Sequence, residues 1–198
     1  MDAGVYLYWI PVGAGAHVVR VCSKAFETLS AGVQRRRPRD LYHSALEVFV
    51  AQERFIIEVT PIPAGAAGDR GVVGEGPVGD RLLGRFRLFR YEIRRWPQGV
   101  IPDVSYAVEM TRVADVAPAR NILDLVPSVP TLVWGRDELG AGDMWNSNSV
   151  TSWLLARAGV DVSRLGPPAG GRAPGWDAGL VAARRPGNYG PAPDVEAA

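Results

Sequence analysis

The sequence predicts one α+β domain over residues 1–165, an antiparallel β-sheet with helices packed on it. Three observations predict this class. A β-branched and aromatic segment lies near the start, two adjacent segments of strand character are separated by a short polar turn, and apolar residues recur at helical spacing before and after them. The 198 residues are enough to bury one core.

The first strand is predicted at residues 4–13, "GVYLYWIPVG", where the final Pro and Gly end the strand. The period then changes, because apolar residues from Val18 to Val33 fall on one face of a helix. Cys22 belongs to that apolar face. We therefore expect its thiol to be buried and unreactive, and not a nucleophile.

A β-hairpin is predicted from residues 41–50 and 54–62, with the turn near Gln52-Glu53. With that turn, Glu47 faces Glu58 across the ladder and Ala45 faces Thr60. The alternation of side chains then places His43, Glu58 and Thr60 on one face of the hairpin. A different loop length would turn Glu58 away.

A Gly-rich loop is predicted at residues 64–80, and a third strand with a β-bulge at residues 84–96, "GRFRLFRYEIRRW". The mixture of arginine and aromatic residues there is also typical of single-stranded nucleic-acid platforms. Strand alternation, however, would bury the aromatic rings on the face opposite the arginines. The pattern therefore favours an ordinary strand with one solvated face.

The second half of the domain is predicted to add a short strand at residues 106–110 and two helices. The first helix begins near Pro118 and is ended by Pro127, and the second covers residues 150–158. From Gly166 to the end, Gly and Pro dominate the composition. Residues 166–198 are therefore expected to form a C-terminal segment with an extended backbone, disordered in part.

Composition excludes several classes of function. The 22 basic and 21 acidic residues give a formal net charge of +1, which argues against a whole-protein electrostatic hold on nucleic acid. There is no apolar stretch long enough to span a membrane and no basic, signal-like N-terminus, so a cytoplasmic protein is expected. The scarcity of lysine beside many arginines indicates a GC-rich, bacterial genome.

Cofactor and metal motifs are incomplete. A single cysteine excludes a multi-cysteine metal site, and "VGAGAH" after the first strand has neither the third glycine of a dinucleotide fingerprint nor the Gly-Lys-Ser/Thr of a P-loop. We therefore expect no metal and no cofactor.

An Asn-Ser-Asn-Ser box at residues 146–149 leads directly into the helix predicted at 150–158. Asn and Ser cap helix N-termini because their side-chain oxygens accept from the free N–H groups of the first turn. Two of each is more than capping needs. A helix N-terminus also stabilises developing negative charge, which suits a serine nucleophile, and His43 is then the obvious base. The residues alone support a cap and a catalytic site about equally.

The order of a strand histidine, "YHSALEV", followed by an Asn-X-Asn box on a helix start, "WNSNSVTSWLL", resembles the circularly permuted branch of the papain-like, NlpC-type superfamily. That branch includes lecithin retinol acyltransferase-like and PPPDE-type proteins, and its nucleophile is a cysteine in an Asn-Cys box. The resemblance covers mainly residues 41–61 and 144–158. Ser147 stands at the position of the family's cysteine. Because serine cannot pre-ionise as a thiolate does, it needs general-base catalysis in the transition state.

The resemblance implies that His43 is the general base and Ser147 the nucleophile. The residue that orients the imidazole ring is then Glu58 or Thr60, and Glu47 is a third option. Ser149 becomes the reactive serine if the box aligns two residues later.

The residues around Ser147 are expected to line a cleft. Asn146 and Asn148 flank the serine, and Trp134 and Trp145 are predicted walls. The predicted function is a hydrolase or acyltransferase that uses a serine nucleophile on amide or ester bonds of a small-molecule, peptide or acyl substrate. The alternative is an inactive relative that holds a peptide, an acyl group or a partner protein in the same cleft.

Overall fold

A computed structural model describes residues 1–13, 27, 35, 37–62, 70–101 and 103–185. The predicted first helix falls almost entirely outside these residues. The predictions made for Cys22, and the second histidine His17, therefore lie outside the described part of the chain.

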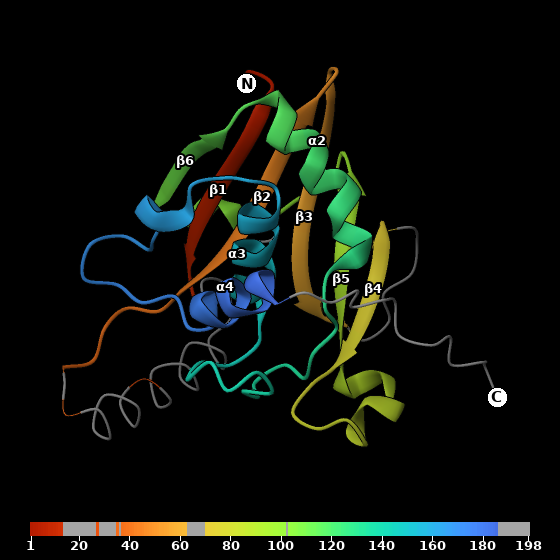
Figure 1. The fold of residues 1–198 in the computed structure, drawn as a ribbon, viewed down its shortest axis with the longest axis vertical. Helices are drawn as coiled ribbons and strands as arrows, with labels where there is room; N and C mark the ends of the chain where they lie inside the picture. Colours follow the sequence, from red (N-terminus) through yellow and green to blue (C-terminus); the bar gives the residue numbers. More distant parts are fainter. Residues whose placement is uncertain (14–26, 28–34, 36, 63–69, 102, 186–198) are drawn as a thin grey trace.

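The described residues form one six-stranded sheet of order β4-β5-β3-β2-β1-β6, and every neighbouring pair is antiparallel. The strands are β1 (Gly4–Pro11), β2 (Tyr42–Val50), β3 (Glu53–Pro61), β4 (Val72–Pro77), β5 (Arg90–Pro97) and β6 (Glu109–Ala114). Together with the helices that cover it, this sheet confirms the predicted α+β class (Figure 1).

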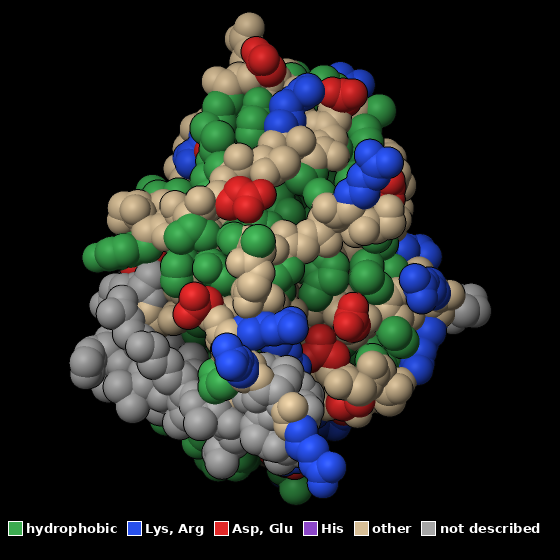
Figure 2. All heavy atoms as spheres, turned by 90° about the vertical axis from the view of Figure 1, so that its left-hand side faces the viewer, with side chains coloured by type: hydrophobic (Ala, Val, Ile, Leu, Met, Phe, Trp, Pro, Cys, Tyr) green, Lys and Arg blue, Asp and Glu red, His purple; other side chains and the backbone are tan. Residues whose placement is uncertain are grey.

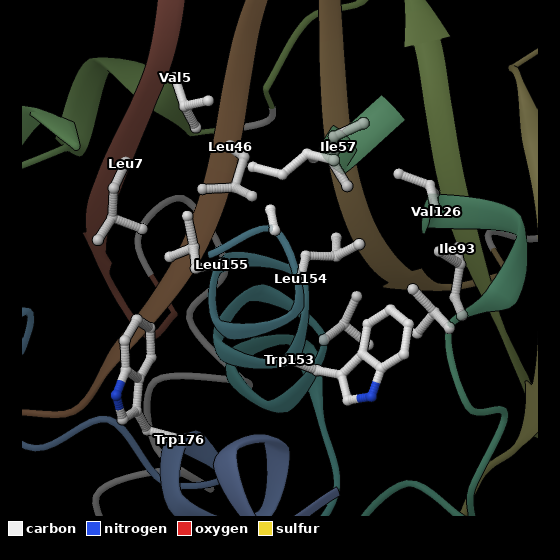
Figure 3. Close-up of a cluster of buried hydrophobic side chains, with 14 of the residues drawn as sticks. Val5, Leu7, Leu46, Ile57, Ile93, Val126, Trp153, Leu154, Leu155 and Trp176 are labelled. Carbon is white, nitrogen blue, oxygen red and sulfur yellow. The ribbon is translucent and has the colours of Figure 1, made fainter. Parts of the chain in front are cut away.

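One face of the sheet is covered by α2 (Val116–Leu125), α3 (Ser147–Arg157) and α4 (Trp176–Arg184); we call it the helix face (Figure 1). Side chains of β1, β2, β3 and β5 point from this face toward Leu154 and Leu155 of α3, both fully buried (Figure 3). Trp176 of α4 packs against Trp9 of β1, with ring centroids 5.2 Å apart. The main core thus lies between sheet and helices.

The opposite face of the sheet carries a second, smaller apolar cluster and several charged residues. Tyr6, Tyr8 and Ile10 of β1 pack there with Ala45, Ile56 and Ile101. Each strand contributes to both faces in alternation, because side chains on a strand alternate in direction.

Within the described residues, no helix has the length and apolar character to cross a bilayer.

The predicted hairpin is formed by β2 and β3, but its turn is Ala51-Gln52, one residue earlier than expected. Both residues have positive φ, 49° and 68°, as a tight two-residue hairpin turn requires. Glu47 consequently pairs with Ile56 and not with Glu58. The ladder is shifted by two residues, and a shift of two leaves every side chain on its predicted face.

The segment predicted as the third strand is only half strand. Residues 83–89 form two 3₁₀ turns, Leu83–Arg85 and Arg87–Phe89, and β5 begins at Arg90. The expected β-bulge and the burial of Phe86 were therefore wrong. The Gly-rich segment 64–80 also contains a strand, β4, in which Gly76 lies directly on the Tyr91 ring, so that a Cβ there would come within 2.4 Å of it.

The C-terminal segment is not simply extended, because α4 forms within it and packs against α3. Gly179 makes the close approach possible: a Cβ at this position would lie 2.0 Å from the Ser149 carbonyl oxygen. Residues 166–185 therefore pack on the same core as the rest of the described chain.

Candidate functional site

The Asn-Ser-Asn-Ser box is first of all a complete helix cap. Asn146 is the N-cap residue of α3, and its Oδ1 accepts from the Asn148 N–H at 2.9 Å. In return, the Ser149 hydroxyl accepts from the Asn146 N–H at 2.9 Å. This reciprocal pair is a capping box, which satisfies donors that a helix start leaves free.

Asn148 ties the helix start to its surroundings. Its Nδ2 donates to the carbonyl oxygens of Tyr42, at 2.9 Å, and Pro174, at 2.8 Å. Its Oδ1 accepts from the Ser44 hydroxyl at 2.8 Å. One buried amide thus joins β2, α3 and the loop before α4, and its role is structural.

Ser147 is the member of the box whose hydroxyl forms no hydrogen bond with any described residue. It lies at the first position of α3, where the backbone N–H also has no acceptor within the helix. Ser147 lines a pocket of about 450 Å³. The pocket is lined by Val12, Leu41, Tyr42, His43, Trp134, Gly135, Met144, Asn146, Ser147, Asn148 and Pro174.

His43 is part of the pocket wall at the start of β2, but strand alternation directs its ring to the opposite face of the sheet. His43 pairs with Ile10 of the second apolar cluster, whereas its neighbour Ser44 reaches α3 on the helix face. Burial lowers the pKa of His43, and the negative charge of Asp103 opposes that shift. The structure therefore does not join the His43 ring to the Ser147 hydroxyl, which the predicted catalytic pair requires.

The residues predicted to orient the imidazole share the face of His43 but have other partners. Glu58 forms an ion pair with Arg94 at 3.3 Å; burial raises its pKa and Arg94 opposes the shift. Glu47 accepts from the Tyr8 hydroxyl and pairs with Arg54. The Thr60 hydroxyl donates only a long bond of 3.4 Å to the Pro61 carbonyl oxygen. None of these contacts involves His43.

Two further predictions at the box were tested by the geometry. Ser149 is fully buried, and its hydroxyl donates to the Gly175 carbonyl oxygen at 2.7 Å, so it is not the exposed serine of a pocket. Trp145 is buried in the core and does not line the pocket, unlike Trp134.

Sequence reasoning missed several residues of the site. Ser44 directly follows His43 in β2. Its hydrogen bond to Asn148 joins residues far apart in the sequence, so no local pattern indicates it. Asp143 was not singled out in the sequence, although its carboxylate accepts from the Met144 and Gly175 N–H groups and burial raises its pKa. Met144 and Pro174 supply apolar pocket walls that no local pattern marks.

The described part of the chain holds no group of three or more His, Cys, Asp or Glu side chains that could bind a metal ion. No family model, curated protein or solved structure matches the chain. The resemblance to the papain-like superfamily therefore stays a prediction from the two quoted motifs.

Proposed function

We propose that the protein is a binding module that holds an acyl group in the pocket at the N-terminus of α3. The observation that carries this proposal is the chemistry of the pocket: an apolar wall with an unpaired hydroxyl at one end. This function is the non-catalytic alternative predicted from the sequence, in which the cleft holds an acyl group. We also propose that the protein is cytoplasmic.

The polar end of the pocket favours an oxygen with negative partial charge. Ser147 lines the pocket, and its hydroxyl and N–H are both able to donate a hydrogen bond. The helix dipole places positive potential at this end of α3. No Asp, Glu, Lys or Arg is among the residues that line the pocket. Because there is no carboxylate to pair with a positive charge, the pocket does not favour a cationic ligand. A carbonyl or carboxylate oxygen is the group that fits these donors.

The remaining walls favour an aliphatic body. Val12, Leu41, Met144 and Pro174 are apolar, and Trp134 adds an aromatic surface. The volume of about 450 Å³ lies within the usual range for small-molecule sites. An acyl chain that ends in a carboxylate or amide combines both requirements.

Binding is favoured over hydrolysis because, among the residues that the structure describes, none is placed as a base to activate Ser147. His43 is the histidine that the described residues contain, and its ring shares a face with Ala45 and Glu47, away from α3. Without a base, a serine hydroxyl at neutral pH is a hydrogen-bond donor and a poor nucleophile.

The test is calorimetric titration of the protein with octanoate and, separately, with octylamine. Octanoate is expected to bind and octylamine is not. Ser147→Ala should weaken octanoate binding about three- to tenfold through loss of one hydrogen bond. Ser147→Leu should abolish binding by filling the pocket. Ser105→Ala and Ser105→Leu, at an exposed serine, are the matched controls. Equal affinity of Ser147→Leu and wild type would refute the pocket as the site.

A further inference from the structure

Residues 82–89, "LLGRFRLF", form a projection between β4 and β5 that carries a concentrated set of exposed apolar side chains. The exposed fractions are 68% for Leu82, 64% for Phe86 and 75% for Leu88. Leu83 and Phe89 are also exposed. Figure 1 shows the two turns, in yellow-green, beyond the ends of β4 and β5. Clustered exposed apolar residues on a folded protein indicate an interaction surface.

The exposure does not come from a loosely held loop, because one backbone bond and one side-chain bond hold the projection to the ends of β4 and β5. The Val78 N–H donates to the Phe89 carbonyl oxygen at 2.8 Å, and the Arg90 Nε donates to the Gly84 carbonyl oxygen at 2.6 Å. A Cβ on Gly84 would lie 2.6 Å from the Cβ of Pro77, so the first turn rests on the end of β4. The apolar side chains are thus held outward by an ordered backbone.

The charges of the projection have one sign. Arg85 and Arg87 lie within it, are exposed, and form no ion pair with a described residue. Arg81 and Arg90 at its ends are already paired, with Glu138 and Glu75 respectively. No acidic residue occurs between Arg81 and Tyr91. The complementary surface is therefore anionic as well as apolar.

We propose that the projection inserts its apolar side chains into the interface of an anionic lipid bilayer, with Arg85 and Arg87 at the headgroups. A bilayer interface accepts leucine and phenylalanine side chains from a convex projection without needing a matching pocket. Arginines near an anionic surface add attraction over about one Debye length, so the near-zero net charge of the whole chain does not oppose it.

Other occupants fit the projection less well. Single-stranded nucleic acid requires a series of stacking surfaces, but only Phe86 and Phe89 of the projection could stack on bases. The other three exposed apolar side chains are leucines, which fit a bilayer interface better. The surface on the side of the molecule seen in Figure 2 differs, because Arg, Asp and Glu side chains are interspersed among its hydrophobic ones. The projection combines exposed apolar side chains with unpaired charge of a single sign.

The projection lies next to the proposed acyl pocket, although the membrane proposal does not depend on that pocket. Val78, at the base of the projection, forms a β-bridge with Trp134, which lines the pocket. Membrane attachment through residues 82–89 would bring the pocket close to the source of acyl groups.

The experiment is co-sedimentation of the full chain with two kinds of vesicle, pure phosphatidylcholine and a mixture containing one quarter phosphatidylglycerol. Binding to the mixed vesicles and little binding to the neutral ones are expected. Phe86→Ser combined with Leu88→Ser should lower the partition coefficient roughly tenfold or more, since two apolar side chains lose their burial. Arg85→Gln and Arg87→Gln should each lower it about fivefold, and added salt should reduce the wild-type value.

The matched control is Val104→Ser combined with Tyr106→Ser, which removes two exposed apolar side chains elsewhere and should leave the partition coefficient unchanged. Circular dichroism of each variant verifies that it is folded. Absence of wild-type binding to the mixed vesicles, or equal binding by the Phe86/Leu88 variant, would overturn the proposal. So would sedimentation velocity showing that the projection instead joins two copies of the chain, with a dimer that the Phe86/Leu88 variant loses.

Discussion

The Ser44 hydroxyl donates a hydrogen bond of 2.8 Å to the side-chain oxygen of Asn148, across the interface between β2 and the start of α3. Both residues are buried. This bond helps to hold α3 against the sheet. Ser44 lies on the same face of β2 as Leu46 and Val48, which pack in the core with α3. Because the Ser44 side chain points toward α3, the side chain of its neighbour His43 points to the opposite face of the sheet.

The Ser44–Asn148 bond is expected to be energetically coupled. Asn148→Ala should lower the free energy of unfolding by about 2–4 kcal/mol, because it removes the acceptor of the Ser44 hydroxyl and the side-chain donor to the Tyr42 carbonyl oxygen. The Pro174 carbonyl oxygen keeps its bond from the Asn146 Nδ2. Ser44→Ala should cost about 1–3 kcal/mol. In a double-mutant cycle by urea denaturation, the double variant should lose less than the sum. Asn121→Ala, at an exposed position of α2, is the control, and additivity of the two single losses would contradict the coupling.

Gly179→Ala should destabilise the packing of α4 on α3. The added Cβ would lie 2.0 Å from the Ser149 carbonyl oxygen and 2.1 Å from the Ser152 hydroxyl, so the helices must separate. We expect a loss of about 1–3 kcal/mol, as in other overpacked cores, measured by thermal or urea denaturation. Gly166→Ala, where a Cβ meets no atom within 4 Å, should change stability little. Equal stability of both variants would mean that α4 does not pack as described.

His43 should titrate below its ordinary pKa of 6.5, because burial disfavours the charged ring. The folded state then binds fewer protons than the unfolded state as the pH falls through 6.5, so stability decreases with acidification. The loss begins near the unfolded pKa and levels off below the folded one. NMR titration of the His43 ring, with denatured protein as the reference, measures the shift.

The same shift predicts a difference between variants. The decline in the free energy of unfolding from neutral to mildly acidic pH should be smaller in His43→Gln than in wild type. A ring that titrates at or above 6.5 in the folded protein would show that His43 is solvated or paired with an acid, contrary to its position.

Serine-directed fluorophosphonate probes should not label Ser147. The described residues offer its hydroxyl no base, and the helix N-terminus alone does not deprotonate a serine. Mass spectrometry of the folded protein after treatment checks this, with a serine hydrolase as the positive control. Labelling that Ser147→Ala and His43→Ala both abolish would instead establish the catalytic pair and overturn the binding proposal.

Periodicity in the sequence predicted most of the sheet and two of the helices, because those segments contain their own signals. Val150, Trp153 and Leu154 repeat at helical spacing, and all are buried in α3. The face shared by His43, Glu58 and Thr60 was also predicted correctly, although the turn was displaced. A shift of two residues in the pairing of the hairpin leaves each side chain on its predicted face. The predicted faces were therefore correct, although the predicted pairs of residues were not.

The remaining features were decided by contacts between distant segments. Gly179 lowers local helix propensity, yet α4 forms because that glycine allows a close approach to Ser149. Conversely, Phe86 has strand character and an extended backbone, but it lies between two 3₁₀ turns, outside the sheet, and is exposed.

The sequence by itself determined the α+β class, the hairpin and the capped start of α3, since each depends on residues within one or two turns or strands of the chain. Only the tertiary structure decided the roles of the box residues. Local chemistry gives each of Ser147, Asn148 and Ser149 a side chain that can donate and accept hydrogen bonds. The contacts of Asn148 with Ser44 and Pro174, and of Ser149 with Gly175, come from distant parts of the chain, and they leave Ser147 as the serine of the box whose hydroxyl has no described partner.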